Sequence, residues 1–185
     1  MMQTEKEEYV VVLDFLPNGY PFDTRPLHRK TSVAQAISKN NFTLLEIIPK
    51  KDVTLQAGEE VYIGDGKRDK VHHVVGRIPG NKLTQTAQGE LEFVIKKLVL
   101  ENPAKYVEFF NKAGPISTRM HQIELIPGIG KKHMWEIIEQ RKDKPFESFE
   151  EMKQRMSLIP DPLKAVVKRI IMEINGEDKY RIFVR

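Results

Sequence analysis

Apolar and polar residues follow two different periods along the chain, and the change falls near residue 84. Before that point, short runs rich in β-branched residues are separated by turn signals such as Pro17-Asn18-Gly19. These runs predict strands at 9–16, 42–48 and 71–78, with a shorter strand after the turn at Gly58. Gly76 lies inside the last run and indicates either a bulge or a close approach of another segment. Four or five short strands without an intervening helical pattern predict a small barrel or a rolled sheet.

After residue 84 the apolar residues recur at helical spacing. Asn102-Pro103 ends a first helix and starts a second, which stops at Gly114-Pro115. A capping-box pattern beginning at Ser148 predicts a short helix at 149–156, and Asn175-Gly176 closes the last long helix. Residues 180–184 predict a strand that returns to the barrel. Four residues spaced i, i+3, i+4 and i+7 predict the first helix over 87–100: Leu91, Val94, Ile95 and Leu98.

The helical part contains an internal repeat with a spacing of 33 residues. Residues 123–127 (IELIP) align with 156–160 (MSLIP), and Lys131 aligns with Lys164. Self-similarity of this kind, with a helix before and after each copy, favours a duplication. The second copy reads Asp-Pro-Leu where the first reads Gly-Ile-Gly, at residues 128–130. We therefore expect function in the copy that carries the glycines.

The glycines of the first copy suit an anion site. Glycine adopts positive φ freely and leaves its backbone N–H exposed, so Gly128-Ile129-Gly130 predicts a sharp turn with accessible amides. A helix starting near Lys131 adds its free N–H groups and the positive end of its dipole, and Lys132 adds charge. Ile129 is expected to point back between the two helices. The pattern favours one phosphate of a polyanion, bound without reading bases.

The stretch ELIPGIGKKHMWEIIEQR resembles the helix-hairpin-helix motif, whose hairpin contacts nucleic-acid phosphates. The resemblance implies that the amides of Gly128 and Gly130, with Lys131, meet the phosphate. Met134 stands where the family usually has a small alanine, so the helices are expected to lie further apart. A plain turn without ligand is the alternative, and the motif also occurs as a protein-interaction module. The matching residues are Ile126, Pro127, Gly128, Ile129, Gly130 and Lys131.

The resemblance covers residues 115–175, and the second copy resembles the degenerate partner of tandem helix-hairpin-helix domains. Asp161 can cap its helix and Pro162 can take the first helical position, which predicts a structural role. The whole chain also resembles a small archaeal family of unknown function that is described only as RNA-binding. We expect an α+β protein with four parts: an OB-like β-barrel at 1–84, a helical linker at 85–114, a tandem helix-hairpin-helix at 115–178 and a C-terminal strand at 179–185.

Basic residues of the expected barrel are a second candidate contact. Lys67, Arg68 and Lys70 lie between two expected strands, and Arg77 lies near the end of the later one. They form either the rim of a nucleic-acid groove, with Tyr62 as a stacking surface, or a solvated hairpin loop. The same two interpretations apply to the basic loop that contains Arg25, His28, Arg29 and Lys30.

Other conspicuous side chains have less specific explanations. His72 and His73 do not predict a metal site, because neighbours on a strand point to opposite faces and no third ligand is close in sequence. Trp135 and the Phe109-Phe110 pair are expected in the core rather than on a base-stacking surface.

Composition narrows the class of protein. The 185 residues include 30 Lys and Arg against 26 Asp and Glu, a formal charge of +4 that mildly favours polyanionic partners. The absence of cysteine excludes disulfides, thiolate zinc sites, iron–sulfur clusters and cysteine nucleophiles. No secretory h-region and no run of about 18 apolar residues is present, so we expect a cytoplasmic protein without membrane contact.

The chain carries none of the common catalytic motifs, including GxSxG, a Walker loop, HExxH and a dinucleotide fingerprint. Base-excision glycosylases share the hairpin but need a larger helical domain for the flipped base, and none precedes this hairpin. We expect a non-catalytic nucleic-acid-binding protein without cofactor or metal, with RNA favoured over DNA. The alternative is a protein-interaction adaptor that docks through the helix-hairpin-helix pair.

Overall fold

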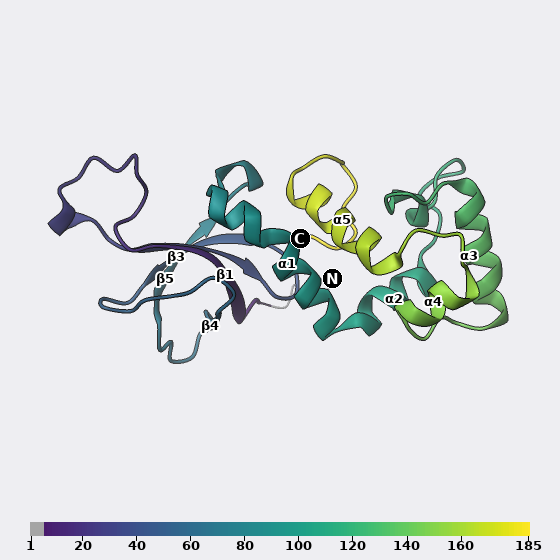
Figure 1. Ribbon diagram of the computed structural model, residues 1–185, viewed down its shortest axis with the longest axis horizontal. Helices are drawn as coiled ribbons and strands as arrows, with labels where there is room; N and C mark the ends of the chain where they lie inside the picture. The colour runs from purple at the N-terminus through teal and green to yellow at the C-terminus, as the bar shows by residue number, and fades with distance from the viewer. Residues whose placement is uncertain (1–5) are drawn as a thin grey trace. The chain divides into compact units, whose positions relative to one another are not determined.

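The computed structural model describes residues 6–185 and has a mixed α+β fold, with strands in the N-terminal part of the chain and five α-helices after them (Figure 1). The expected order of strands before helices is confirmed. The chain forms two compact units: one contains the chain up to Val94 together with Met172–Arg185, and the other contains Ile95–Ile171. Within the described residues, no helix combines the length and apolar character needed to cross a membrane.

Five antiparallel strands form a curled sheet in the first unit, in the order β4-β1-β2-β3-β5. Within the part of the chain that the structure describes, no hydrogen-bonded ladder joins the outer strands β4 and β5, so the sheet is an open half-barrel. Of the two architectures predicted, a small barrel and a rolled sheet, it corresponds to the rolled sheet. A register shift between Val74 and Gly76 confirms the predicted bulge. The bounds are Tyr9–Leu16 (β1), Val33–Ser38 (β2), Leu44–Pro49 (β3), Glu60–Tyr62 (β4) and Val71–Arg77 (β5).

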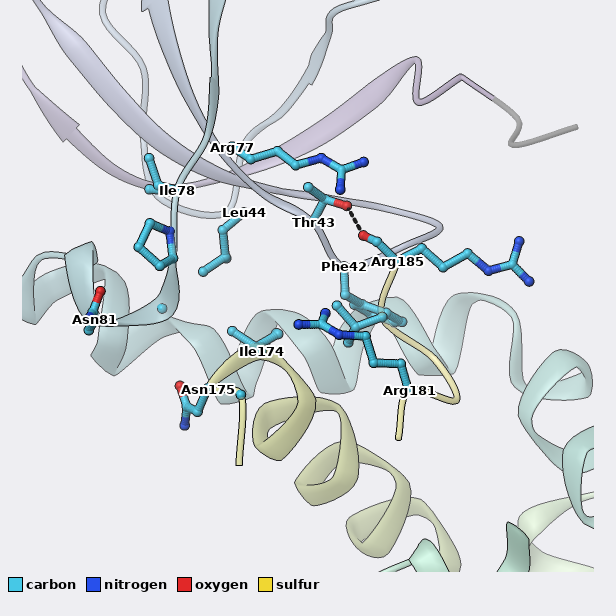
Figure 2. Close-up of a pocket in the computed structure, with 14 residues that line it drawn as sticks. Phe42, Thr43, Leu44, Arg77, Ile78, Asn81, Ile174, Asn175, Arg181 and Arg185 are labelled. Carbon is cyan, nitrogen blue, oxygen red and sulfur yellow. Dashed lines mark hydrogen bonds between the residues drawn. The ribbon is translucent and has the colours of Figure 1, made fainter. Parts of the chain in front are cut away.

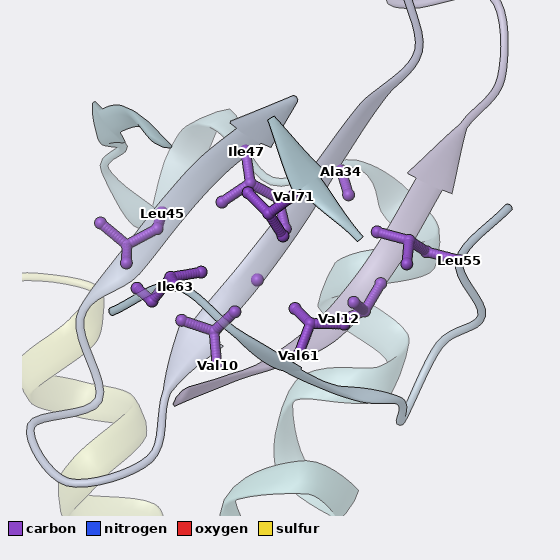
Figure 3. Packing of buried hydrophobic residues seen from close by; sticks show 10 residues of the cluster. Val10, Val12, Ala34, Leu45, Ile47, Leu55, Val61, Ile63 and Val71 are labelled. Atoms are coloured by element: carbon purple, nitrogen blue, oxygen red, sulfur yellow. The ribbon is translucent and has the colours of Figure 1, made fainter. Parts of the chain in front are cut away.

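One face of the half-barrel closes over an apolar core (Figure 3). Period-two alternation places Val10 and Val12 of β1 on this face, together with Ala34 and Ala36 of β2. Val11, which points to the other face of β1, is buried as well, so this central strand is covered on both sides. The other members of the cluster are Leu45, Ile47, Leu55, Val61, Ile63 and Val71.

Buried polar groups fix the start of α1 (Gln85–Glu101) against the sheet. The fully buried Gln35 donates through Nε2 to the carbonyl of Lys82 at 2.9 Å, and its Oε1 accepts from the backbone N–H of Thr84 at 2.8 Å. The Thr84 hydroxyl donates to Asp14 Oδ2 at 2.6 Å and accepts from the amide of Ala87, in the first turn of α1. The helix expected over 87–100 is therefore present and begins slightly earlier.

The remaining helices follow their sequence signals. Proline occupies the first position of α2, after Asn102, and Ser148 Oγ accepts from the amide of Glu151 at 3.0 Å to cap α4. Phe110 is buried as expected, and Phe109 is half-buried. The bounds are Pro103–Lys112 (α2), Lys131–Asp143 (α3), Phe149–Arg155 (α4) and Pro162–Ile174 (α5), with 3-10 helices at Leu27–Arg29 (η1), Gly80–Lys82 (η2) and Gln122–Leu125 (η3).

The strand predicted at residues 180–184 is wrong. The backbone N–H groups of Ile182, Phe183 and Val184 donate to the carboxylate of Glu173, at 2.7, 3.0 and 2.9 Å. A buried side chain thus supplies the acceptors that a neighbouring strand would have supplied. The apolar pattern correctly indicated burial of this tail, but burial alone does not distinguish a strand from a segment held by one carboxylate.

Candidate functional site

A tight turn joins η3 to α3 in the second unit. The amide of Ile126 donates to the carbonyl of Ile123, and that of Ile129 donates to the carbonyl of Ile126, each at 3.1 Å. Gly128 has φ +82°, and a Cβ there would lie 2.9 Å from Cγ of Pro160, in the turn of the second copy. Conformation and packing therefore both require glycine at 128. Ile129 is 5% exposed, which confirms that it points inward.

Neither requirement applies to Gly130. Its φ of −90° and ψ of −171° are extended values open to any residue, and no atom outside its chain neighbours lies within 4 Å of an added Cβ. Gly130 is the N-cap of α3, and its carbonyl accepts the first helical bond, from Met134 at 2.9 Å. Four backbone amides precede that bond: those of Gly130, Lys131, Lys132 and His133. Within residues 6–185, none of them donates a hydrogen bond to another residue. They lie at the positive end of the helix dipole.

The second copy satisfies the equivalent groups internally. Asp161 Oδ1 accepts from the amides of Leu163 and Lys164, at 3.0 and 3.3 Å, and the Asp161 carbonyl accepts from Ala165 at 2.9 Å. The first helical residue is Pro162, which has no N–H to satisfy. The predicted structural cap is confirmed. The two copies therefore differ in whether the start of the helix is closed by a side chain.

The two lysines of the hairpin have different surroundings. Lys131 Nζ lies 3.1 Å from Glu124 Oε1 and donates to the carbonyl of Arg119 at 3.0 Å. The N–H of His121, and then Lys131, lower the pKa of Glu124, which keeps this carboxylate charged. Lys132 is exposed and forms no hydrogen bond or ion pair with any other described residue. Lys132 is thus the freer cation, whereas Lys131 shares its charge with Glu124.

His121 anchors the hairpin and should make its stability depend on pH. Its Nδ1 accepts from the amide of Ile123 at 3.1 Å, so it serves as the N-cap of η3 in its neutral form. Burial, and then the nearby Arg141, lower the pKa of His121. The unfolded state consequently binds the proton first, and we expect the free energy of unfolding to fall as pH drops below about 6.5, the ordinary histidine value.

Urea unfolding at about pH 7.5 and about pH 5.5 measures this dependence. His121→Asn keeps a capping acceptor and removes the titration, so it should lose less stability between the two pH values than the wild type does. Equal losses in the two proteins would contradict the role assigned to His121.

Trp135 is 58% exposed, so its predicted place in the core is wrong. The buried stripe of α3 consists of Met134, Ile137 and Ile138, and Trp135 lies outside it. Trp135 follows Lys131 by one helical turn, so the two residues lie on the same side of α3. An exposed aromatic residue is therefore present within one turn of the lysines of the hairpin. The expectation failed because residue type alone does not determine which face of a helix a side chain occupies.

The basic residues predicted on the sheet unit do not form one cluster. Lys67, Arg68 and Lys70 lie in the loop before β5, whereas Arg77 ends that strand, about 20 Å further along. Lys70 pairs with Glu59, and Arg68 donates to a carbonyl of its own loop at 2.9 Å. Lys67 is exposed and has no hydrogen bond or ion pair within residues 6–185. A single groove lined by all four side chains is not present.

Two expectations about neighbouring aromatic residues also change. Tyr62 is half-buried with its ring edge-on to Tyr9, so it offers little open stacking surface. His72 and His73 do not diverge, because their Nδ1 atoms lie 2.8 Å apart beside a register shift between β3 and β5. Across residues 6–185, no group of three or more His, Cys, Asp or Glu side chains is placed to hold a metal ion.

The loop between β1 and β2 presents an aromatic ring that the sequence did not single out. Phe22 is 78% exposed and stacks on Tyr20 with 5.0 Å between ring centroids and an interplanar angle of 7°. The Tyr20 hydroxyl donates to Glu46 Oε2 at 2.6 Å, and burial together with this bond raises the pKa of Tyr20 to about 12. The ring of Phe22 therefore rests on a fixed partner. The same loop carries Arg25, His28, Arg29 and Lys30.

The similarity to known proteins extends over almost the whole chain and is not limited to the hairpin. A family model described as a protein of unknown function, DUF655, matches residues 6–185. The chain belongs to the DUF655 family. A crystal structure assigned to DUF655, that of Af1531 from Archaeoglobus fulgidus, is 47% identical, with a TM-score of 0.90 over 97% of this chain and 100% of that chain. The uncharacterized protein MJ0038 of Methanocaldococcus jannaschii is 43% identical over 181 residues, which cover 97% of this chain and 80% of that protein. The expected archaeal family of unknown function is thus confirmed as DUF655.

Proposed function

We propose that this protein is a non-catalytic nucleic-acid-binding protein that holds the phosphate backbone at the hairpin around residues 128–132. The observation that carries the proposal is Gly130, a glycine at a helix N-cap where the local conformation and packing would accept any side chain. In the second copy, Asp161 caps the corresponding helix, α5. A side-chain cap at residue 130 would stabilise α3, but it would also occupy the amides at the start of that helix. A ligand that needs those amides therefore explains why the residue is glycine.

The hairpin would bind one phosphate group by main-chain donation. The amides of Gly130, Lys131 and Lys132 point out of the start of α3, where the helix dipole favours an anion. Lys132 neutralises a neighbouring phosphate, and Lys131 contributes as it turns from Glu124. None of these groups reads a base edge, so the binding would depend on the backbone and not on sequence. The resemblance to the helix-hairpin-helix motif supports the same geometry.

RNA is the proposed nucleic acid. We interpret the half-barrel as OB-like, an architecture that binds single strands, and Phe22 with its basic loop suits the stacking of an unpaired base. Sequence-tolerant recognition of RNA usually combines such stacking with backbone charge. Lys67 would add a further backbone contact from the loop before β5.

Fluorescence anisotropy with four labelled oligonucleotides tests the proposal: single-stranded RNA, double-stranded RNA, single-stranded DNA and duplex DNA. Single-stranded RNA should bind best, and the slope of log affinity against log salt should be about −0.7 for each phosphate neutralised. Three such contacts would lower the affinity about 20-fold between about 50 and about 200 mM salt. Affinities that do not change with salt for any of the four would exclude phosphate capture.

A protein-interaction adaptor is the second candidate. Two exposed apolar side chains of the second unit favour it: Leu158, in the turn of the second copy, and Trp135 on α3. A partner protein could cover such residues by apolar contacts. This mode of binding would need neither the open amides nor the lysines, which provides a means of separating the two candidates.

A further inference from the structure

A pocket of about 730 Å³ opens on the sheet unit, away from the hairpin in sequence (Figure 2). Its walls are the start of β3, the end of β5 with η2, the end of α5, and the C-terminal tail, all of which belong to the first unit. Pockets of this size hold ligands as large as a nucleotide. Nothing in the proposed hairpin mechanism uses this pocket.

The polar side of the pocket is cationic. Arg77, Arg181 and Arg185 line it, and none of the lining residues is an Asp or Glu. In Figure 2 the guanidinium of Arg181 extends between Phe42 and Ile174, whereas the side chain of Arg185 points away. The side chains of Arg77 and Arg181 form no hydrogen bond or ion pair with another described residue. Two guanidinium groups are thus available to an anion in the pocket.

The tail that carries Arg181 is fixed at two places. Glu173 is 1% exposed and accepts from three successive tail amides at 2.7 to 3.0 Å. At the end of the tail, the amide of Arg185 donates to the carbonyl of Asn41 at 3.1 Å, and its main-chain oxygen accepts from Thr43 Oγ1 at 2.7 Å. Because the tail backbone is held at both positions, binding needs to order only the side chains of its arginines.

The floor of the pocket is apolar and its far rim carries amides. Ile78 and Ile174 are half-buried and Pro79 is exposed, and these three side chains supply the apolar surface that a ligand can reach. Asn81 and Asn175 lie at the rim, where their side-chain amides can both donate and accept. Arginines on one side and an apolar floor with amides on the other suit a ligand that combines an anionic group with a planar, hydrogen-bonding ring.

We propose that this pocket binds a nucleotide, with its phosphate on Arg77 and Arg181 and its base against Ile78, Pro79 and Ile174. The nucleotide comes either from a free nucleoside monophosphate or from the end of a polynucleotide chain, and both sources present the same phosphate and base. This binding site is independent of the hairpin, because its residues lie in the other unit.

Isothermal titration calorimetry on the full chain tests the site, with Gly130→Asp present in all proteins so that the hairpin contributes nothing. The probes are AMP, UMP, adenosine and inorganic phosphate. We expect AMP or UMP to bind with a Kd on the order of 100 µM, and adenosine and phosphate to bind at least about 10-fold more weakly. Arg77→Gln with Arg181→Gln should weaken nucleotide binding at least about 10-fold, because two charge-assisted hydrogen bonds are lost.

Lys6→Gln with Lys51→Gln is the matched control, since it removes two exposed charges of the same unit outside the pocket and should leave the affinity unchanged. A short RNA carrying a terminal phosphate distinguishes the two sources. If it binds more tightly than AMP, and the Arg77 and Arg181 variant loses this binding, the pocket binds the end of a chain. If it binds as tightly as AMP, the pocket binds a free nucleotide. Absence of binding by every nucleotide, adenosine binding as tightly as AMP, or full binding by the arginine variant would each overturn the proposal.

Discussion

Gly130→Asp should remove most nucleic-acid binding while leaving the protein at least as stable as the wild type. An aspartate at this position can accept from the amides of Lys132 and His133, as Asp161 accepts from Leu163 and Lys164 in the second copy. Capping should raise the free energy of unfolding by roughly 0.5 kcal/mol. The same carboxylate occupies the phosphate position and repels the ligand, so we expect an affinity loss of about 100-fold.

Gly89→Asp is the matched control for this prediction. Gly89 is exposed in α1, has no neighbouring atom within 4 Å of an added Cβ, and receives the same change in charge. Its nucleic-acid affinity should stay within about twofold of the wild type. Gly128→Ala is less informative, because positive φ and contact with Pro160 should destabilise the turn itself. Wild-type affinity in a folded Gly130→Asp protein would contradict the proposed site.

Lys131→Glu with Lys132→Glu should also reduce binding about 100-fold or more, because two charges beside the phosphate are reversed. The neutral pair Lys131→Gln with Lys132→Gln avoids a new repulsion with Glu124 and should make the salt dependence shallower by about 1.4, that is, about 0.7 for each phosphate that the lysines no longer neutralise. Anisotropy titrations at several salt concentrations measure both effects. Circular dichroism on the same samples establishes that the helices remain folded.

The repeat supplies a control with the same change in net charge. Lys164 aligns with Lys131 and is exposed on α5, as is Lys168. Reversal of both charges should change the affinity little, since Asp161 already closes the start of that helix. A protein-interaction adaptor predicts a different pattern, in which the Lys131 and Lys132 variants keep their protein partner and Trp135→Ala loses it. Equal loss of nucleic-acid binding in the two lysine pairs would point to general surface charge instead of the hairpin.

Local signals in the sequence predicted much of the fold correctly. Turn residues and β-branched runs located β1 and β5, and capping residues located the starts of α2, α4 and α5. Asp161 directly before Pro162 predicted the cap of α5, and the glycine inside the last strand run indicated the bulge at Gly76. These predictions were correct because each feature depends on residues that are close in sequence.

The features that the sequence did not predict depend on tertiary contacts or on which face of a helix a residue occupies. The tail lacks its expected strand because Glu173, a residue of α5, accepts its amides. Trp135 is exposed because the buried stripe of α3 passes beside it. The pocket around Arg181 joins segments that lie more than about ninety residues apart, so no local pattern could reveal it.

The most direct test of phosphate capture is a nuclear magnetic resonance titration of isotope-labelled protein with single-stranded RNA. We predict that the backbone amides of Gly130, Lys131 and Lys132 show the largest chemical-shift changes, in the direction expected for a new hydrogen bond. The amides of Leu163 and Lys164, already bound to Asp161, should move little. Saturating RNA that leaves the Gly130 and Lys132 amides unchanged would contradict phosphate capture by the hairpin.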